Sequence, residues 1–275
     1  MDVIEQRTLL RLKNWFGEYV KTFRTEDFDC QQNINLKEEH TARVCLEIID
    51  IGKSLDLNQT DLYLAEVMAL FHDVGRFEQY AKYRTFFDLV SEDHAALGVK
   101  VLKEHKVLEE IDPLTRDLIF KVILYHNRAE LPEDETEECL FFAKLLRDAD
   151  KLDIWRVVTD YYHNKNGRQN SSIELDLPDI PKISDEVCQD LLAGEIVKAT
   201  SIKTLNDFKL LQIGWIYDVN FPRTFQIIKE RGYIEKIISV LPQTETVMEI
   251  YSQVKSFLER HCSDNFQRYV ERDQG

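Results

Sequence analysis

The sequence predicts an all-α protein. Its apolar residues recur mostly at intervals of three and four, which is the period of one helix face. Only nine glycines and six prolines interrupt the 275 residues. Hydrophobic residues make up 44% of the chain and charged residues 31%, as in an ordinary globular protein. A chain of this length and composition is expected to fold around a substantial core.

The first helices contain most of the residues of chemical interest. We expect a helix over residues 36–55 that includes His40. The next helix has Thr60 as its candidate N-cap and ends near Gly75, a residue suited to a left-handed C-terminal cap. The histidine–aspartate pair just before this glycine would then lie in the last turn of the helix.

Two further helices each have a histidine at one end. The first is expected to start at Ser91 or Asp93, which gives His94 a position in its first turn. The second covers residues 114–127 and has His126 in its last turn.

The rest of the chain is also expected to be helical. A longer helix over residues 137–162 follows an acidic loop, and the polar segment 163–184 is expected to be an extended connection, either a lid or a linker. The remaining predicted helices cover 184–193, 204–219, 222–231 and 244–262. We assign residues 20–165 to a core that contains the histidines named above, and residues 166–275 to the connection and C-terminal helices, which we expect to pack on that core.

Charge and cysteine usage exclude several classes of protein. The net charge of −15 repels polyanions, so binding to duplex nucleic acid is not expected. No segment resembles a signal peptide or a membrane span, and we expect a cytoplasmic protein. The five cysteines are scattered and contain no close pair with zinc-ligand or redox spacing.

The adjacent residues His72 and Asp73 are the strongest chemical signal. On a helix, neighbouring side chains point about 100° apart, so these two can converge on one ion only where a helix end faces it. A divalent metal needs further nitrogen and oxygen ligands. His40, one helix upstream, and Asp150, on the long helix, are candidates for these ligands.

The order of these residues resembles the HD-domain superfamily of metal-dependent phosphohydrolases. The segment Leu70-Phe71-His72-Asp73-Val74-Gly75-Arg76 is similar to the signature of that family, and the resemblance extends over about residues 36–162. It implies an HD-type helical bundle with additional C-terminal helices. It also implies a first ion bound by four residues, His40, His72, Asp73 and Asp150.

The family resemblance further implies a second ion. Residues 94–98 and 125–127 are similar to the two extra histidine motifs of two-metal members, in which Asp73 would bridge to an ion held by His94 and His126. Cyclic dinucleotides are disfavoured as substrates, because the paired histidines of that branch are absent here. Asp148 competes with Asp150 as a ligand, but on a helix the two point about 200° apart.

The expected activity is hydrolysis of a small phosphorylated metabolite, for which a nucleotide is one candidate, by metal-activated water with His72 and Asp73 as catalytic residues. One or two ions of Mn, Fe, Mg, Ni, Co or Zn would bind, and Arg76 and Lys151 would contact the substrate phosphate. The alternatives are an iron-dependent HD-type oxygenase and a non-catalytic nucleotide-sensing module. A homodimer is also compatible with the sequence. The candidates to orient the ligand histidines are Glu39, Asp93 and Asp148.

Overall fold

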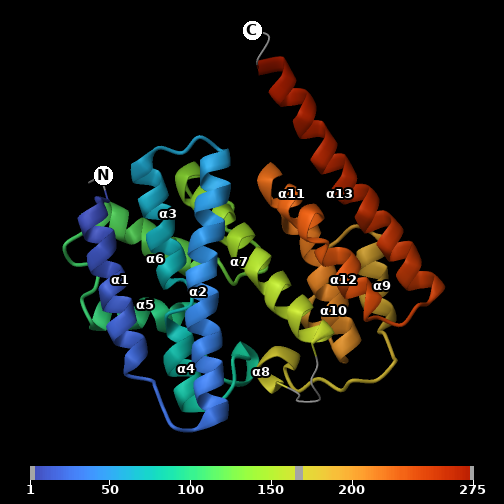
Figure 1. Ribbon diagram of the computed structural model, residues 1–275, viewed down its shortest axis with the longest axis horizontal. Coiled ribbons are helices and arrows are strands. Elements are labelled where there is room, and N and C mark those ends of the chain that lie inside the picture. The colour runs from blue at the N-terminus through green and yellow to red at the C-terminus, as the bar shows by residue number, and fades with distance from the viewer. Residues whose placement is uncertain (1–3, 165–169, 273–275) are drawn as a thin grey trace. The chain divides into compact units, whose positions relative to one another are not determined.

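The computed structural model describes residues 4–164 and 170–272, and within these ranges it contains helices and no β-strand (Figure 1). The all-α prediction is confirmed. The chain divides into two compact units, Met1–Asp153 and Ile154–Gly275, and the division falls inside helix α7. No helix among the described residues combines the length and the apolarity that a membrane span requires.

The first unit is a bundle of short and medium helices. Helix α2 packs against α3 and α4, while α5 packs against α4 and α6 (Figure 1). Its elements are α1 (Gln6–Lys21), α2 (Phe28–Ser54), α3 (Gln59–Phe71), α4 (Gly75–Tyr83), the 3₁₀ turn η1 (Asp88–Val90), α5 (His94–Glu104), α6 (Pro113–Tyr125) and the beginning of α7 (Glu137–His163). Val67, Met68 and Phe71 of α3 are fully buried, so α3 runs through the core of this unit.

Several helices in this unit begin at side-chain caps. The Asp93 carboxylate accepts from the backbone N–H groups of Ala95 and Ala96, which confirms Asp93 as the start of α5. The expectation for α3 was wrong: Asn58, not Thr60, is the cap, because the Asn58 side chain accepts from the two backbone N–H groups that follow.

Gly75 has a different role from the predicted one. It does not end α3 in a left-handed conformation; α3 ends at Phe71, and Gly75 begins α4. A Cβ atom at Gly75 would lie 2.2 Å from the carbonyl oxygen of His94 and 2.5 Å from the backbone nitrogen of Gly98. The absence of a side chain therefore allows α4 and α5 to touch backbone to backbone, next to Asp73 and His94.

Among the described residues, four α-helices were not predicted: α1, α4, the one-turn α8 (Ser171–Glu174) and α12 (Tyr233–Ser239). Helix α2 begins eight residues before the expected start. Helix α1 buries Leu12 and Val20 completely. Helices α4 and α12 have nine and seven residues, too short for a clear apolar period.

The second unit contains the end of α7 and the later helices. They are α8 (Ser171–Glu174), α9 (Asp185–Leu192), η2 (Ala199–Ser201), α10 (Leu205–Gly214), η3 (Trp215–Asp218), α11 (Pro222–Arg231), α12 and α13 (Glu245–Arg272). Trp155 is fully buried in this unit, and its indole N–H donates to the carbonyl oxygen of Gln212. The predicted connection 163–184 contains the one-turn helix α8, and its residues 165–169 lie outside the described ranges.

The close contact at Gly75 gives a prediction about stability. Gly75→Ala is expected to lower the free energy of unfolding by about 1–3 kcal/mol, because the new methyl group overlaps backbone atoms that cannot move away singly. Gly17→Ala is the matched control: Gly17 lies within α1 with no atom near its would-be Cβ, and the change should stabilise by about 0.5–1 kcal/mol. Chemical denaturation of both variants measures this, and equal effects would contradict it.

Candidate metal centre

The His72-Asp73 pair lies in the tight turn between α3 and α4. The backbone N–H of Val74 donates to the carbonyl of Phe71 at 3.2 Å, and that of Arg76 donates to the carbonyl of Asp73 at 2.9 Å. Both side chains therefore project from one helix junction. His72 is fully buried and Asp73 is 3% exposed, so the turn presents a carboxylate and an imidazole inside the bundle.

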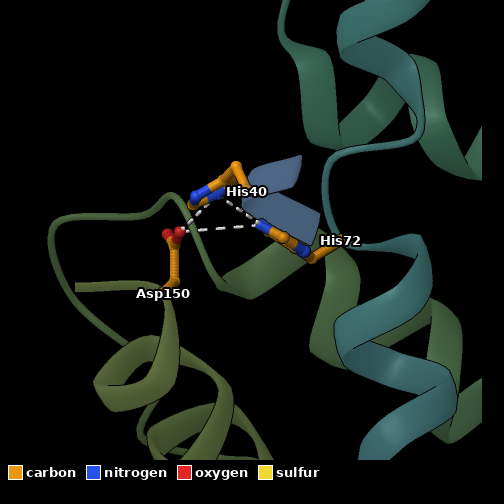
Figure 2. A group of neighbouring side chains, drawn as sticks. All are labelled: His40, His72 and Asp150. Carbon is orange, nitrogen blue, oxygen red and sulfur yellow. Dashed lines mark hydrogen bonds and ion pairs between the residues drawn. The ribbon is translucent and has the colours of Figure 1, made fainter. Parts of the chain in front are cut away.

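A first cluster consists of His40, His72, Asp150 and one oxygen of Asp73. His40 Nε2 lies 3.2 Å from His72 Nε2 and 3.1 Å from Asp150 Oδ1 (Figure 2). His72 Nε2 lies 3.6 Å from Asp150 Oδ1. Asp73 Oδ2 lies 3.4 Å from His40 Nε2 and 3.6 Å from His72 Nε2. Four residues from α2, the α3–α4 turn and α7 thus direct donor atoms at one point.

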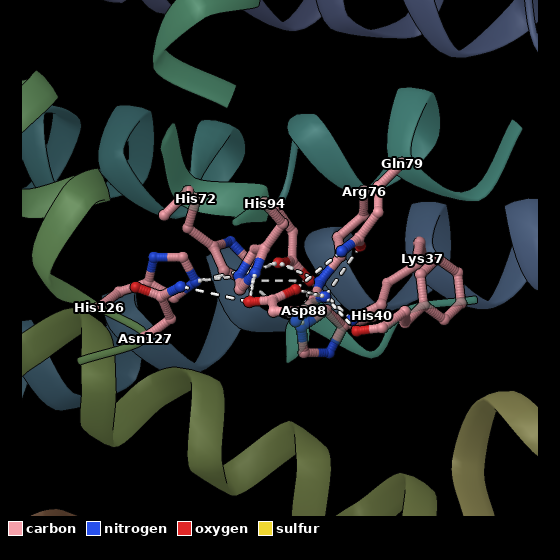
Figure 3. Close-up of polar contacts among 12 residues, drawn as sticks. Lys37, His40, His72, Arg76, Gln79, Asp88, His94, His126 and Asn127 are labelled. Carbon is pink, nitrogen blue, oxygen red and sulfur yellow. Dashed lines mark hydrogen bonds and ion pairs between the residues drawn. The ribbon is translucent and has the colours of Figure 1, made fainter. Parts of the chain in front are cut away.

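A second cluster uses the other oxygen of Asp73. His94 Nε2 lies 3.3 Å from Asp73 Oδ1, and His126 Nε2 lies 3.9 Å from it. The Nε2 atoms of the two histidines are 3.0 Å apart (Figure 3). Asp73 therefore faces the first cluster with Oδ2 and the second with Oδ1.

Two of the histidines are oriented by the helix that precedes them. His72 follows α3, and its Nδ1 lies 2.7 Å from the carbonyl oxygen of Ala69; His126 follows α6, and its Nδ1 lies 2.6 Å from the carbonyl oxygen of Ile123. A carbonyl oxygen can only accept, so both Nδ1 atoms carry the hydrogen and donate. The neutral rings must then have their lone pairs on Nε2, facing the clusters.

The other two histidines are oriented by carboxylates. His40 Nδ1 lies 2.7 Å from Asp153 Oδ2, and His94 Nδ1 lies 2.6 Å from Asp88 Oδ2. Asp153 is itself held by Arg43, whose Nη2 donates to Oδ2 at 3.0 Å. A carboxylate behind an imidazole fixes its ring orientation and makes the opposite nitrogen a better metal ligand.

Asp88 is also held in place by other groups. It accepts from Arg76 and from the Gln79 amide, each at 2.8 Å, and Asn127 Nδ2 is 3.4 Å away (Figure 3). Asp88, Asp93 and His94 also lie close enough together to be considered as metal ligands. However, Asp88 accepts from His94, and Asp93 caps α5, so both carboxylates already have structural roles.

The donor set fits divalent metal ions. Two unprotonated Nε2 atoms at 3.2 or 3.0 Å repel each other unless they share a cation, either a proton or a metal ion. Ligands at about 2.1 Å from one ion are about 3.0 Å apart in an octahedron and about 3.4 Å apart in a tetrahedron. The donor separations of the first cluster, 3.1–3.6 Å, lie close to these values.

The carboxylates of the clusters remain ionised. Burial alone would raise the pKa of Asp73, but nearby positive charges, above all Lys37, hold it well below its usual value. Burial would likewise raise the pKa of Asp150, and hydrogen bonds from His40 and His72 lower it. Both carboxylates are thus available as anionic ligands.

The pKa values of the histidines shift in different directions in the two clusters. Burial, together with the positive charge of His94, lowers the pKa of His126 to about 3. Burial and Arg76 also lower the pKa of His94. The pKa of His40 shifts the other way: burial opposes its charged form, but hydrogen bonds to Asp150 and Asp153 outweigh burial and raise it. The two histidines of the second cluster are therefore neutral near pH 7. In the first cluster, a metal ion would compete with a proton on His40.

Arg147 supports the position of His126. Its guanidinium donates to the carbonyl oxygens of Tyr125, His126 and Arg128, at the C-terminal end of α6. A cation at that end satisfies carbonyl groups that have no partner in the helix. Helix α7 thus contributes to both clusters, through Asp150 and through Arg147.

The structure brings all six sequence-predicted ligands together, from five different elements. Of the two residues expected to contact substrate, Arg76 contacts Asp73. Arg76 Nε lies 3.3 Å from Asp73 Oδ1, and Lys151 follows Asp150 in α7, where it is 8% exposed. Nearby, the rings of Tyr80 and Phe86 are 4.7 Å apart and both residues are buried, so they contribute to the packing of the core.

A comparison with protein families agrees with this geometry. Residues 38–155 match the family described as the HD domain. This part of the chain is similar to the HD domain. The HD domain defines a superfamily of metal-dependent phosphohydrolases, and the matched segment includes all six clustered residues. No curated protein and no solved structure gave a significant match to the chain.

Sequence reasoning missed the residues that orient His40 and His94. The proposed candidates were Glu39, which contacts Arg43, and Asp93, which caps α5, together with Asp148. For Asp153 a signal was present, because it lies three residues after Asp150 and therefore on the same helix face. For Asp88 no such signal existed, since it begins the three-residue 3₁₀ turn η1 between α4 and α5, which is too short to show a periodic pattern.

The orienting carboxylates give a reciprocal prediction. Asp153→Asn is expected to weaken metal affinity at the first cluster by about 10–100-fold, because the amide is a weaker acceptor for His40. Asp88→Asn should have the same effect on the second cluster through His94. Titrating each purified variant with Mn²⁺ or Zn²⁺ tests this, and each variant serves as the control for the other. If each variant lost metal affinity equally at both clusters, the prediction would be contradicted.

Proposed function

We propose that this protein hydrolyses phosphate esters of small molecules, with two divalent ions bound by the two clusters. The observation that supports this most directly is the position of Asp73, whose two oxygens face separate groups of donors at 3.3–3.9 Å. A carboxylate shared in this way is suited to bridging two ions. The match to the HD domain supports hydrolysis of a phosphate ester as the type of reaction. The choice of small molecules as substrates is our proposal.

In this proposal the first ion is bound by His40, His72, Asp150 and Asp73, and the second by Asp73, His94 and His126. When bound, such ions lower the pKa of a water molecule and offset negative charge on a phosphoryl group. Imidazole donors favour Mn, Fe, Co, Ni or Zn over Mg, which prefers oxygen ligands and retains its water.

The chain's own residues prepare the site for this chemistry. The hydrogen bonds at Nδ1 hold the four imidazoles with Nε2 inward, so little rearrangement is needed to bind ions. Burial of the clusters excludes bulk water and strengthens electrostatic interactions within them. Arg76 and Lys151 remain the predicted contacts for substrate phosphate, and Arg76 also holds Asp73 and Asp88 through its guanidinium.

The first test is activity against a panel of phosphomonoesters and phosphodiesters. Metal-loaded wild-type protein is expected to release phosphate or nucleoside from at least one of them, and Asp73→Asn should abolish this release because both clusters lose an anionic ligand. Asp93→Asn is the matched control: it removes the same charge nearby, while asparagine still caps α5.

Full metal loading without product from any ester would contradict the proposed hydrolysis. If the protein instead retains iron and consumes oxygen with an organic substrate, the oxygenase alternative would replace it. If it binds nucleotides with neither reaction, a sensing module would be the better description.

The second test is metal stoichiometry. Elemental analysis of wild-type protein should give about two ions per chain, and His126→Ala should lower this to about one, because the second cluster then retains only His94 and one oxygen of Asp73. His105→Ala is the control, since His105 contacts Trp15 and Tyr19 and belongs to neither cluster. A wild-type value of one under excess metal would show that the second cluster is not a metal site.

A further inference from the structure

Lys37 reaches the centre from helix α2, one turn before His40. Its ammonium nitrogen lies 2.7 Å from Asp73 Oδ2, the oxygen that faces the first cluster. Its side chain is 16% exposed, and the ammonium also lies 5.3 Å from the centroid of the Phe86 ring. A lysine is thus held at the edge of the clusters, with one side still open to solvent.

The bonding of Lys37 differs from that of Arg76, the other cation beside Asp73. The Arg76 guanidinium donates to Asp73, Asp88, Gln79 and the carbonyl oxygen of Phe86, so it is fixed by the protein. Among the described residues, Lys37 donates one hydrogen bond, to Asp73. An ammonium group has three donors, and its four-carbon stem is flexible. The Lys37 ammonium can therefore donate to a second anion, or its flexible side chain can turn from Asp73 towards that anion.

We propose that Lys37 binds the phosphate group of the substrate, and that its ion pair with Asp73 is the arrangement it adopts when no phosphate is present. This assignment rests on the proposed function, because it requires divalent ions at the clusters. It deepens that function by naming a positioning cation that the HD signature at residues 70–76 does not include.

The charge on Asp73 explains why Lys37 would change partner. Asp73 Oδ2 lies within 3.6 Å of both His40 Nε2 and His72 Nε2, so an ion bound by these histidines would share that oxygen with the ammonium. Two cations at one carboxylate oxygen repel each other, which weakens the ion pair of Lys37. A phosphate group beside the ions supplies anionic oxygens and restores a partner for the ammonium.

A purely structural role for Lys37 predicts something different. If the lysine only neutralised Asp73 in the folded chain, its removal would change stability or metal affinity and would leave phosphate binding unaltered. The two roles are therefore separated by measuring metal affinity and phosphate affinity on the same variants.

The experiment compares wild type, Lys37→Met and Lys37→Arg, all loaded with Mn²⁺, by calorimetric titration with inorganic phosphate. Lys37→Met is expected to bind phosphate at least about tenfold more weakly, which is the loss of one charged contact. Its Mn²⁺ affinity should be equal to or higher than that of wild type, because a competing cation has been removed from Asp73. Lys37→Arg should recover part of the phosphate affinity.

The matched control is Lys13→Met, which removes a lysine paired with Glu66 of α3, away from the clusters, and should change neither affinity. Equal phosphate affinity in wild type and Lys37→Met would overturn the assignment, as would loss of Mn²⁺ binding in Lys37→Met. Phosphate binding is measured without turnover. A wild-type protein that hydrolyses no ester, yet binds phosphate in a Lys37-dependent way, would therefore refute the proposed function and support the role of Lys37.

Discussion

Both clusters depend on the Asp73 carboxylate, because each of its two oxygens faces a different cluster. One oxygen faces His40 and His72, and the other faces His94. For this to happen, Asp73 must lie where helices from three directions meet, and it must stay ionised although it is buried. The turn between α3 and α4 meets the first requirement. The surrounding cations meet the second, since an isolated buried carboxylate would take up a proton.

The contact between Gly75 and α5 follows from the same constraint. His94 begins α5, and its donor atom can reach Asp73 only if the start of α5 lies against the turn that contains Asp73. The missing side chain at Gly75 makes that approach possible. A residue expected to end a helix therefore determines the distance between two helices, and through it the spacing between Asp73 and His94.

The sequence was sufficient to predict the six residues of the clusters. It was not sufficient to predict the residues that orient their side chains or bring their helices together. The fold class followed from apolar periodicity, and the six convergent residues from a motif order that resembles a known family; their roles as ligands remain a prediction. Asp88 and Gly75 could not be interpreted correctly from sequence, because their roles depend on contacts with α5 that exist only in the folded chain. The short helix α4 was missed for a related reason, since it is defined by packing more than by its own pattern.

The orientation of the imidazoles also connects metal content to the energetics of folding. Folding brings four Nε2 atoms into two close pairs, and without a shared cation each pair is a cost that the rest of the core must offset. A ligand that binds only the folded chain stabilises it by mass action, and here a metal ion would in addition remove that repulsion. Two preparations of the same chain that differ only in bound metal would then differ in heat resistance, in susceptibility to proteases and in the amount that survives in a cell. If the clusters bind ions as proposed, the supply of metal would therefore also influence how much folded protein is present.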